Sequence, residues 1–515
     1  MPGPVRRSYW RRSRWLRRGA VALSSLLLWA VPVLAQRQSV EEGLQAALAL
    51  IEAQPTPVFA EDHGLPPLSQ WRSTHYDLQK LLAEQWGYAL HFGRVTDSVV
   101  ANLEDPESAP RQLLALTAAD PERYPLHVII APAGSIKSFM NAGFPEDAFI
   151  RDADGKLVED RRRISPLAPD SCFEMLGDHE GELVKAIRKY APIALVTNGG
   201  EYGINASGHS AKCLAQDPRV MQAKGDRPWR EFLADHRARH DRLIRERVKR
   251  AVPDLPLYIY YTATACGHPH RNRYDGWDQW GFVYRPGTSD IPSGQSYYMH
   301  YTSGFTGDND LLTQFLNGRA QEIAAGEPLS YNWMSPGWVR RSKEEQDGPV
   351  ADAALWLGYL KCVYTAGAIG NVHGYFGANP LQDPIEKTVP PMLALAHAHA
   401  LFTHLEDLLR NGDLLPGPDK HRWSTDLPAY EFPTGEATVR VLVRKHRDEP
   451  RWLITAWSAD GETRSVKVTV PDLGEVSVEA HAAGCVYVAS KNAAGEVEFD
   501  RQDPTPEDPT ATWRR

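Results

Sequence analysis

Strand-like and helix-like segments alternate along most of this chain, and this alternation limits the folds that it can adopt. Repeated strand–helix units are typical of a parallel sheet whose faces are covered by helices. About seven clear strands, with a doubtful further one near residues 150–168, favour a closed (β/α)8 TIM barrel over an open doubly wound sheet. The seven expected strands are residues 87–94, 126–132, 192–198, 256–262, 296–302, 329–334 and 368–376.

Helical spacing of apolar residues occurs before and between these strands. The expected helices are residues 40–53, 76–85, 109–118, 182–190, 229–252, 310–325, 351–366 and 391–410. The sequence has no G-x-G-x-x-G or G-x-x-x-x-G-K-[ST] fingerprint, which disfavours a nucleotide-binding protein.

After Gly412 the pattern changes to short segments in which apolar and polar residues alternate between turns. Such a pattern predicts a small C-terminal antiparallel β-sandwich. The fold class is therefore α/β, a barrel followed by a sandwich. The expected division is a signal peptide over residues 1–35, a barrel over 36–415, a sandwich over 425–500 and a disordered tail over 501–515, the last being rich in Pro, Asp and Thr.

The amino-terminal segment has the features of an export signal. Seven arginines lie between Arg6 and Arg18, an apolar stretch follows from Ala20 to Leu34, and small residues precede a cleavage site after Ala35. The apolar stretch is short for a membrane span. We expect a secreted or periplasmic protein with no stable membrane span after cleavage.

Charge narrows the range of partners. The whole chain has 57 basic and 65 acidic residues, and loss of the seven arginines would leave a net charge near −15. An acidic protein of this kind is a poor partner for nucleic acid or for an anionic membrane. The sequence assigns no oligomeric state.

The five cysteines include no C-x-x-C pair, so zinc-ribbon and redox motifs have no support. Export permits disulfides, and a Cys172–Cys213 bond would bracket the strand at residues 192–198. The sequence leaves this pairing open.

The segment Pro192–Gly203 provides the best candidate for chemistry. Its apolar run reads as a buried parallel strand that opens into a loop containing Gly199, Gly200 and Glu201. The carboxyl ends of parallel strands are where α/β enzymes hold their catalytic groups. Glu201 is therefore the candidate general acid, with Tyr202 and apolar neighbours expected to raise its pKa.

Polar and aromatic residues follow the other expected strands at the same edge. Rings that stack on apolar faces while donating a hydrogen bond suit sugar-like ligands. The candidate substrate-binding residues are His91, Arg94, Asn198, Tyr202, His268, Trp277, Trp280, His300, Asp308, Trp333, Trp338, His373 and Tyr375.

In these segments the chain resembles the TIM-barrel glycoside hydrolases, in particular the large clan that carries its acid/base Glu after the fourth strand. The resemblance rests on Thr197-Asn198-Gly-Gly-Glu201, on Asn332-Trp333 and on His373-Gly-Tyr375. It implies a glycosidase that acts on a carbohydrate with two carboxyl groups. We expect no cofactor and no metal.

The chain departs from that clan at two points. Two glycines stand between the Asn and the Glu, where the clan has Asn directly before Glu. The clan also places a nucleophilic Glu after the seventh strand, whereas residues 329–336 contain none and Glu327 falls at the opposite end of that strand.

Glycosidic cleavage normally needs a second carboxyl group beside the acid. Asp275 and Asp278, in an aromatic loop after the fifth expected strand, are the candidates. Asp308 and Asp310 precede a helix, and at least one of them is better explained as its N-cap than as a catalytic base. The pair His268 and His270 could ligate a metal, but the sequence has no third ligand at a diagnostic spacing.

Two other functions remain open from the sequence. A polysaccharide lyase would use a Tyr or His to abstract a proton, and the chain is rich in both. A catalytically inactive barrel that only binds glycans would explain the missing Glu after the seventh strand.

Overall fold

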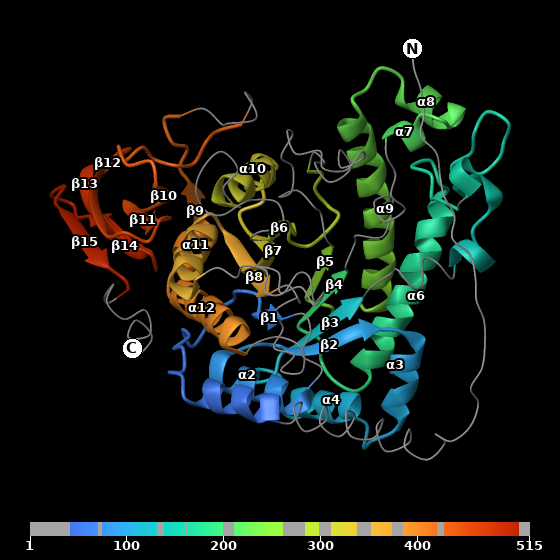
Figure 1. The fold of residues 1–515 in the computed structure, drawn as a ribbon, viewed down its shortest axis with the longest axis horizontal. Helices are drawn as coiled ribbons and strands as arrows, with labels where there is room; N and C mark the ends of the chain where they lie inside the picture. Colours follow the sequence, from blue (N-terminus) through green and yellow to red (C-terminus); the bar gives the residue numbers. More distant parts are fainter. Residues whose placement is uncertain are drawn as a thin grey trace, which may run out of the picture.

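Two four-stranded parallel sheets form the centre of the computed structural model of this chain (Figure 1). The structure describes residues 42–70, 75–130, 139–160, 162–198, 211–260, 284–297, 311–336, 352–372, 385–419 and 427–503. One sheet has the order β1-β8-β7-β6 and the other β2-β3-β4-β5. Their strands are β1 (Ser69–Gln70), β2 (Leu90–Val95), β3 (Leu126–Ile130), β4 (Leu195–Asn198), β5 (Leu257–Tyr260), β6 (Gln295–Tyr297), β7 (Ser330–Ser335) and β8 (Ala368–Val372).

A parallel bridge joins the two sheets. Leu68, just before β1, pairs with Tyr88, and the N–H of Ala89 donates to the C=O of Leu68 over 2.7 Å. The strands therefore form one parallel run of order β6-β7-β8-β1-β2-β3-β4-β5. All carboxyl ends of this run lie at the same edge.

The structure corrects the expected strand numbering. The segment near residues 150–168 contributes no strand to the sheet; it folds back on itself through antiparallel bridges between Phe149 and Ile164 and between Arg151 and Leu157. The first strand is instead the two-residue β1, which the sequence analysis missed. The two errors compensate, so β4 remains the fourth strand.

Helices fill most connections between the strands. They are the helix at residues 42–52, α2 (Tyr76–Trp86), α3 (Asp97–Ala101), α4 (Ala109–Ala119), α6 (Asp170–Arg188), α7 (Ala211–Leu214), α8 (Pro218–Lys224), α9 (Trp229–Ala251), α10 (Leu311–Ala324), α11 (Ala353–Thr365), α12 (Ile385–Thr403) and α13 (Glu406–Asn411), with short 3₁₀ turns at η1 (Asn102–Glu104), η2 (Glu146–Ala148) and η3 (Val158–Asp160). The single helix expected over residues 391–410 is in fact two, α12 and α13. No helix in the described ranges is long and apolar enough to cross a membrane.

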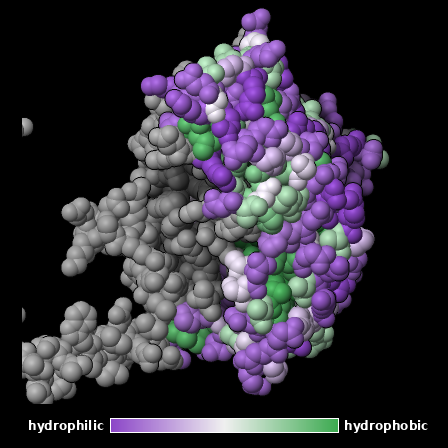
Figure 2. Space-filling view, turned by 90° about the vertical axis from the view of Figure 1, so that its right-hand side faces the viewer, coloured by the Kyte–Doolittle hydropathy of each residue, from purple (hydrophilic) through white to green (hydrophobic). Residues whose placement is uncertain are grey.

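Helices α6 and α9 lie side by side on the outside of β4 and β5 (Figure 1). Glycines allow this close approach: a Cβ at Gly177 would come within 2.7 Å of the Arg247 Cβ, and one at Gly181 within 2.7 Å of the Ala251 Cβ. Hydrophilic residues cover much of the side of the molecule on which these helices lie (Figure 2). The side of the pair that faces the sheet is buried in the apolar cluster with β2 to β5.

The C-terminal residues form an antiparallel five-stranded sheet, β15-β14-β11-β10-β9, and a separate hairpin, β12-β13. One apolar cluster contains residues of both, including Val441, Ile454, Val468 and Val478. The strands are β9 (Gly412–Leu414), β10 (Val439–His446), β11 (Arg451–Ser458), β12 (Arg464–Val470), β13 (Gly474–Ala480), β14 (Cys485–Lys491) and β15 (Val497–Arg501).

Cysteines contribute to these cores as thiols. Cys172, Cys213, Cys362 and Cys485 are buried and free. The Cys172–Cys213 disulfide that the sequence left open is therefore not formed here. Cys266 lies outside the described residues.

Two buried cations connect the C-terminal sheet to the helices. Arg444 of β10 donates to the carbonyl oxygens of Leu408 and Leu409 in α13 and of Thr365 in α11. Lys361 of α11 pairs with Asp503 over 2.6 Å, and both are almost fully buried. Asp503 falls in the segment expected to be a disordered tail, and the structure places it against Lys361.

Gly358 lets α11 lie against the C-terminal sheet. A Cβ there would overlap the indole of Trp457 and the carbonyl of Ala482.

We expect Gly358→Ala to lower the free energy of unfolding by about 1–3 kcal/mol through overpacking, measured by chemical denaturation. Gly64→Ala is the matched control, since its Cβ would meet only the flexible ends of Glu406 and Arg410. Equal stability of the two variants would contradict this packing.

Candidate active site

The structure describes the side chains of three predicted site residues, His91, Asn198 and Trp333, and the backbone alone of Arg94. The remaining predicted residues lie outside the described residues, and their roles stay predictions. These are Glu201, Asp275, Asp278, Tyr202, His268, Trp277, Trp280, His300, Asp308, Trp338, His373 and Tyr375.

Strand register divides β2 to β5 into two faces. Leu90, Leu126, Val196 and Tyr258 pack with residues of α4, α6 and α9 in one apolar cluster, and this is the helix-covered face. Side chains alternate between faces along a strand. His91 pairs in register with His127, and Thr197 pairs with Ile259, so these residues belong to the opposite face, which we call the inner face.

Three polar side chains form a row on the inner face of neighbouring strands. His91 of β2 and His127 of β3 have ring centroids 6.0 Å apart. The Nε2 of His127 lies 2.7 Å from the Oγ1 of Thr197 on β4. His127 and Thr197 are fully buried, and His91 is 5% exposed. This His91–His127–Thr197 row crosses the strands that lead toward the edge where Glu201 follows in sequence.

Burial sets the protonation state of this row. Desolvation lowers the pKa of His127 well below its ordinary value, and the neighbouring His91 lowers it further. His127 is therefore a neutral imidazole that can exchange a hydrogen bond with the Thr197 hydroxyl in either direction, according to its tautomer. His127 and Thr197 were not among the predicted site residues. The Leu-His pairs at residues 90–91 and 126–127 of two expected strands were the sequence signal that could have found His127.

Asn198 lies on the helix-covered face instead. Its Nδ2 donates to the Oε2 of Glu180 and to the hydroxyl of Tyr258, each over 2.9 Å, and all three side chains are fully buried. Glu180 belongs to α6, so this cluster lies between the helix and the carboxyl end of β4, with Tyr258 contributed by the second residue of β5. A contact between Asn198 and substrate stays a prediction.

The structure confirms the expectation that Glu327 lies at the amino end of the seventh strand. Glu327 precedes β7 at its amino end, where its Oε1 accepts a hydrogen bond of 2.9 Å from the Tyr284 hydroxyl. It is therefore at the opposite edge from β4's carboxyl end. Trp333, within β7, is 2% exposed, and its predicted role as a sugar platform stays a prediction.

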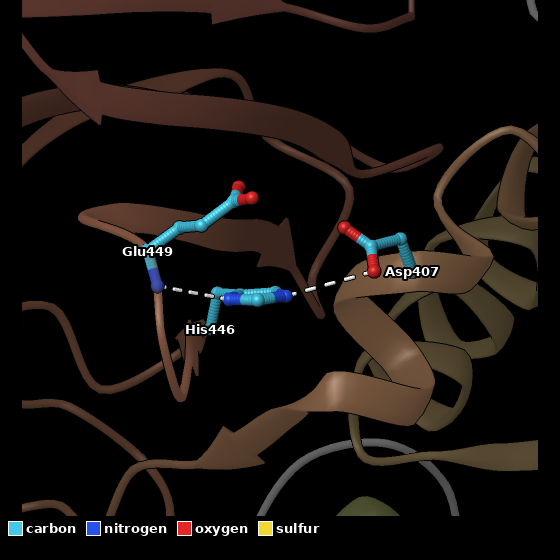
Figure 3. Close-up of side chains that lie close together, drawn as sticks. All are labelled: Asp407, His446 and Glu449. Atoms are coloured by element: carbon cyan, nitrogen blue, oxygen red, sulfur yellow. Dashed lines mark hydrogen bonds and ion pairs between the residues drawn. The ribbon is translucent and has the colours of Figure 1, made fainter.

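A second group of titratable side chains lies far from this edge in sequence. Asp407 of α13 and the pair His446 and Glu449 meet with their ligand atoms within 4.8 Å of one another (Figure 3). The Nδ1 of His446 already accepts the backbone N–H of Glu449 over 3.0 Å, which directs its other nitrogen toward Asp407. Arg451 bridges Asp407 and Glu449, each over 2.9 Å. A guanidinium thus supplies the positive charge of this cluster.

Comparisons with known proteins give a structural resemblance. No protein-family model and no curated protein match the chain. An α-amylase from Anoxybacillus is 10% identical over 73% of this chain and 78% of its own, with a TM-score of 0.37. A glycoside hydrolase family 5 protein from Bacteroides vulgatus is 10% identical over 80% and 82%, with a TM-score of 0.39. A β-galactosidase from Halorubrum lacusprofundi is 12% identical over 67% and 57%, with a TM-score of 0.40.

All three are glycoside hydrolases, the class that the sequence resembles. Because the identities and TM-scores are low, this agreement adds no argument for a particular activity or substrate.

The buried imidazoles predict how stability depends on pH. Burial lowers the pKa of His127, His240, His397 and His399. Below about pH 6.5 the unfolded chain binds protons that the folded chain does not, so stability must fall as the pH falls. We expect the free energy of unfolding to drop between pH 6.5 and 5, by up to about 1.4 kcal/mol per pH unit for each imidazole.

Denaturation curves across this pH range test the contribution of His127. His127→Gln should reduce the pH slope by close to one proton. Thr197→Val should lower stability at every pH and leave the slope unchanged, because it removes the hydroxyl and keeps the imidazole. A His127→Gln slope equal to that of the wild type would show that His127 is protonated in the folded state.

Proposed function

We propose that this chain is a (β/α)8-barrel glycoside hydrolase with Glu201 as its general acid. The observation that carries the proposal is the position of β4. It ends at Asn198, three residues before Glu201 in the sequence, at the carboxyl edge of an eight-stranded parallel run. In barrel enzymes that edge carries the chemistry.

Two sets of hydrogen bonds support closure of the sheet into a barrel. The hydroxyl of Tyr331 on β7 reaches the Oγ of Ser69 on β1 over 2.8 Å, across the intervening β8. The segment before β6 also bonds to β5: the N–H of Asp290 donates to the Tyr258 carbonyl over 2.9 Å, and the Asp290 carboxylate accepts from the Tyr258 N–H over 2.7 Å. The second set brings the two outer strands of the run toward each other.

Glycosidase chemistry assigns a separate catalytic role to each carboxyl group. Glu201 would protonate the leaving oxygen, and Asp275 or Asp278 would act as nucleophile or activate water. The buried His91–His127–Thr197 row lines the inner face beneath the carboxyl edge. His127 and Thr197 supply neutral hydrogen-bonding groups there.

Substitution of the acid gives the sharpest test. Glu201→Gln keeps the shape and removes the titrating proton, so we expect kcat to fall by about 100-fold or more. The loss should be larger for glycosides with poor leaving groups than for activated aryl glycosides, because a good leaving group needs less protonation. The substrate is identified first, by measuring which members of a panel of plant, algal and microbial glycans release reducing ends when treated with the wild type.

Glu327→Gln is the matched control, since Glu327 lies at the amino end of β7. It should leave kcat unchanged. If Glu201→Gln and wild type release sugar equally, Glu201 is not the acid. Products with an ultraviolet-absorbing double bond would identify a polysaccharide lyase. Binding of glycans with no turnover would identify an inactive barrel.

A further inference from the structure

A carboxyl group is buried where the rest of helix α6 presents an apolar face to the sheet. Leu176, Leu183, Val184 and Ile187 of α6 all belong to the apolar cluster that covers β2 to β5. Glu180 lies among them and is fully buried. Burial of a carboxyl group without a compensating partner is costly, so its presence needs an explanation.

The partners of Glu180 connect it to the end of β4. Its Oε2 accepts a hydrogen bond of 2.9 Å from the Nδ2 of Asn198, the last residue of that strand. The Tyr258 hydroxyl of β5 lies 2.9 Å from the same Nδ2 and donates toward the same Oε2 over 3.4 Å. Glu180 of α6 thus holds the side chain of Asn198, the last residue of β4, and connects Asn198 to Tyr258 on the neighbouring strand.

Charges around the cluster favour a neutral carboxyl. Desolvation, with a smaller contribution from Asp241 of α9, raises the pKa of Glu180 to about 8 despite the opposing hydrogen bonds from Asn198 and Tyr258. Arg237 is held by Asp241 over 3.2 Å within α9. His240, stacked on Phe173, has a pKa well below its ordinary value and brings no positive charge.

We propose that Glu180 is a positioning residue that holds Asn198, and through it the carboxyl end of β4, the strand that Glu201 follows in the sequence. This inference rests on the proposed function. Glu180 itself acts from the helix-covered face, through Asn198. A leucine in its place would pack there and remove the carboxyl acceptor of the Asn198 amide, leaving the hydrogen bond to the Tyr258 hydroxyl.

The first experiment is independent of activity. In protein labelled with ¹⁵N-asparagine, the side-chain amide signal of Asn198, assigned with Asn198→Asp, should move as the pH is raised from 6 to 9.5. The signal should stay constant over the same range in Glu180→Gln. If the wild-type signal does not move, or moves equally in Glu180→Gln, then Glu180 does not titrate against Asn198 and the inference fails.

The second experiment measures hydrolysis. Glu180→Leu should lower kcat by roughly 10- to 100-fold with little change in KM, because a displaced catalytic group impairs the chemical step. Glu180→Gln, which still offers an acceptor oxygen, should retain most of the activity. It should also abolish any alkaline loss of kcat that follows ionisation of Glu180.

Leu183→Ala separates positioning from general destabilisation. Leu183 is buried on the same helix and in the same apolar cluster, so its truncation weakens the α6 packing without touching Asn198. All variants are compared at a temperature at which each is folded. Equal losses of kcat in Leu183→Ala and Glu180→Leu would overturn the positioning role. If the wild type hydrolyses no glycoside, the proposed function fails, while the asparagine signal still decides whether Glu180 controls Asn198.

Discussion

The hydrogen bond from the Ala89 N–H to the Leu68 carbonyl is the contact on which the sheet's continuity depends. It lies beside β1, the shortest strand, and it joins two four-stranded sheets into one parallel run. The carboxyl ends of β2 to β5 and those of β6 to β8 thereby lie along one edge, and the bonds between Asp290 and Tyr258 connect the same two halves on the other side. A site assembled from loops of both halves requires that single edge.

Position along a strand then decides which role a polar residue has. Thr197 and Asn198 are adjacent, yet Thr197 meets His127 on the inner face and Asn198 meets Glu180 beneath helix α6. A shift of one residue in register would exchange these partners. Both faces of β4 are therefore specified by hydrogen bonds as well as by apolar packing, which fixes the end of the strand from two sides.

The sequence predicted most of the long elements because their apolar spacing is strong, as in α9 and β3. It missed β1 because two residues show no periodicity. It began helix α6 near Glu182 instead of Asp170, since Gly177 and Gly181 weaken helix propensity and serve packing against α9. The segment near residues 150–168 contains strand-like residues, but they pair with each other and not with the sheet.

The site was less accessible to prediction, for a different physical reason. Asn198 stood out as a polar residue at a strand end, but its carboxyl partner Glu180 is eighteen residues away on a helix, and no sequence spacing connects the two. Within α6, Glu180 occupies a position that helical spacing assigns to the core. Sequence patterns locate a polar residue along an element, whereas its role depends on which buried partner it meets.

Buried partners also decide how the C-terminal antiparallel sheet meets the helices that cover the parallel sheet. The last carbonyl groups of a helix have no partner within the helix. In α11 and α13 several are satisfied by Arg444 of β10, while Ala366, just after α11, bonds to Arg319 of α10. Strand β9 follows α13 directly and pairs with β10. The C-terminal sheet thus completes the hydrogen bonding of the helices beside β7 and β8. We therefore regard it as part of what holds the last strands of the parallel run in place, and not as an appended unit.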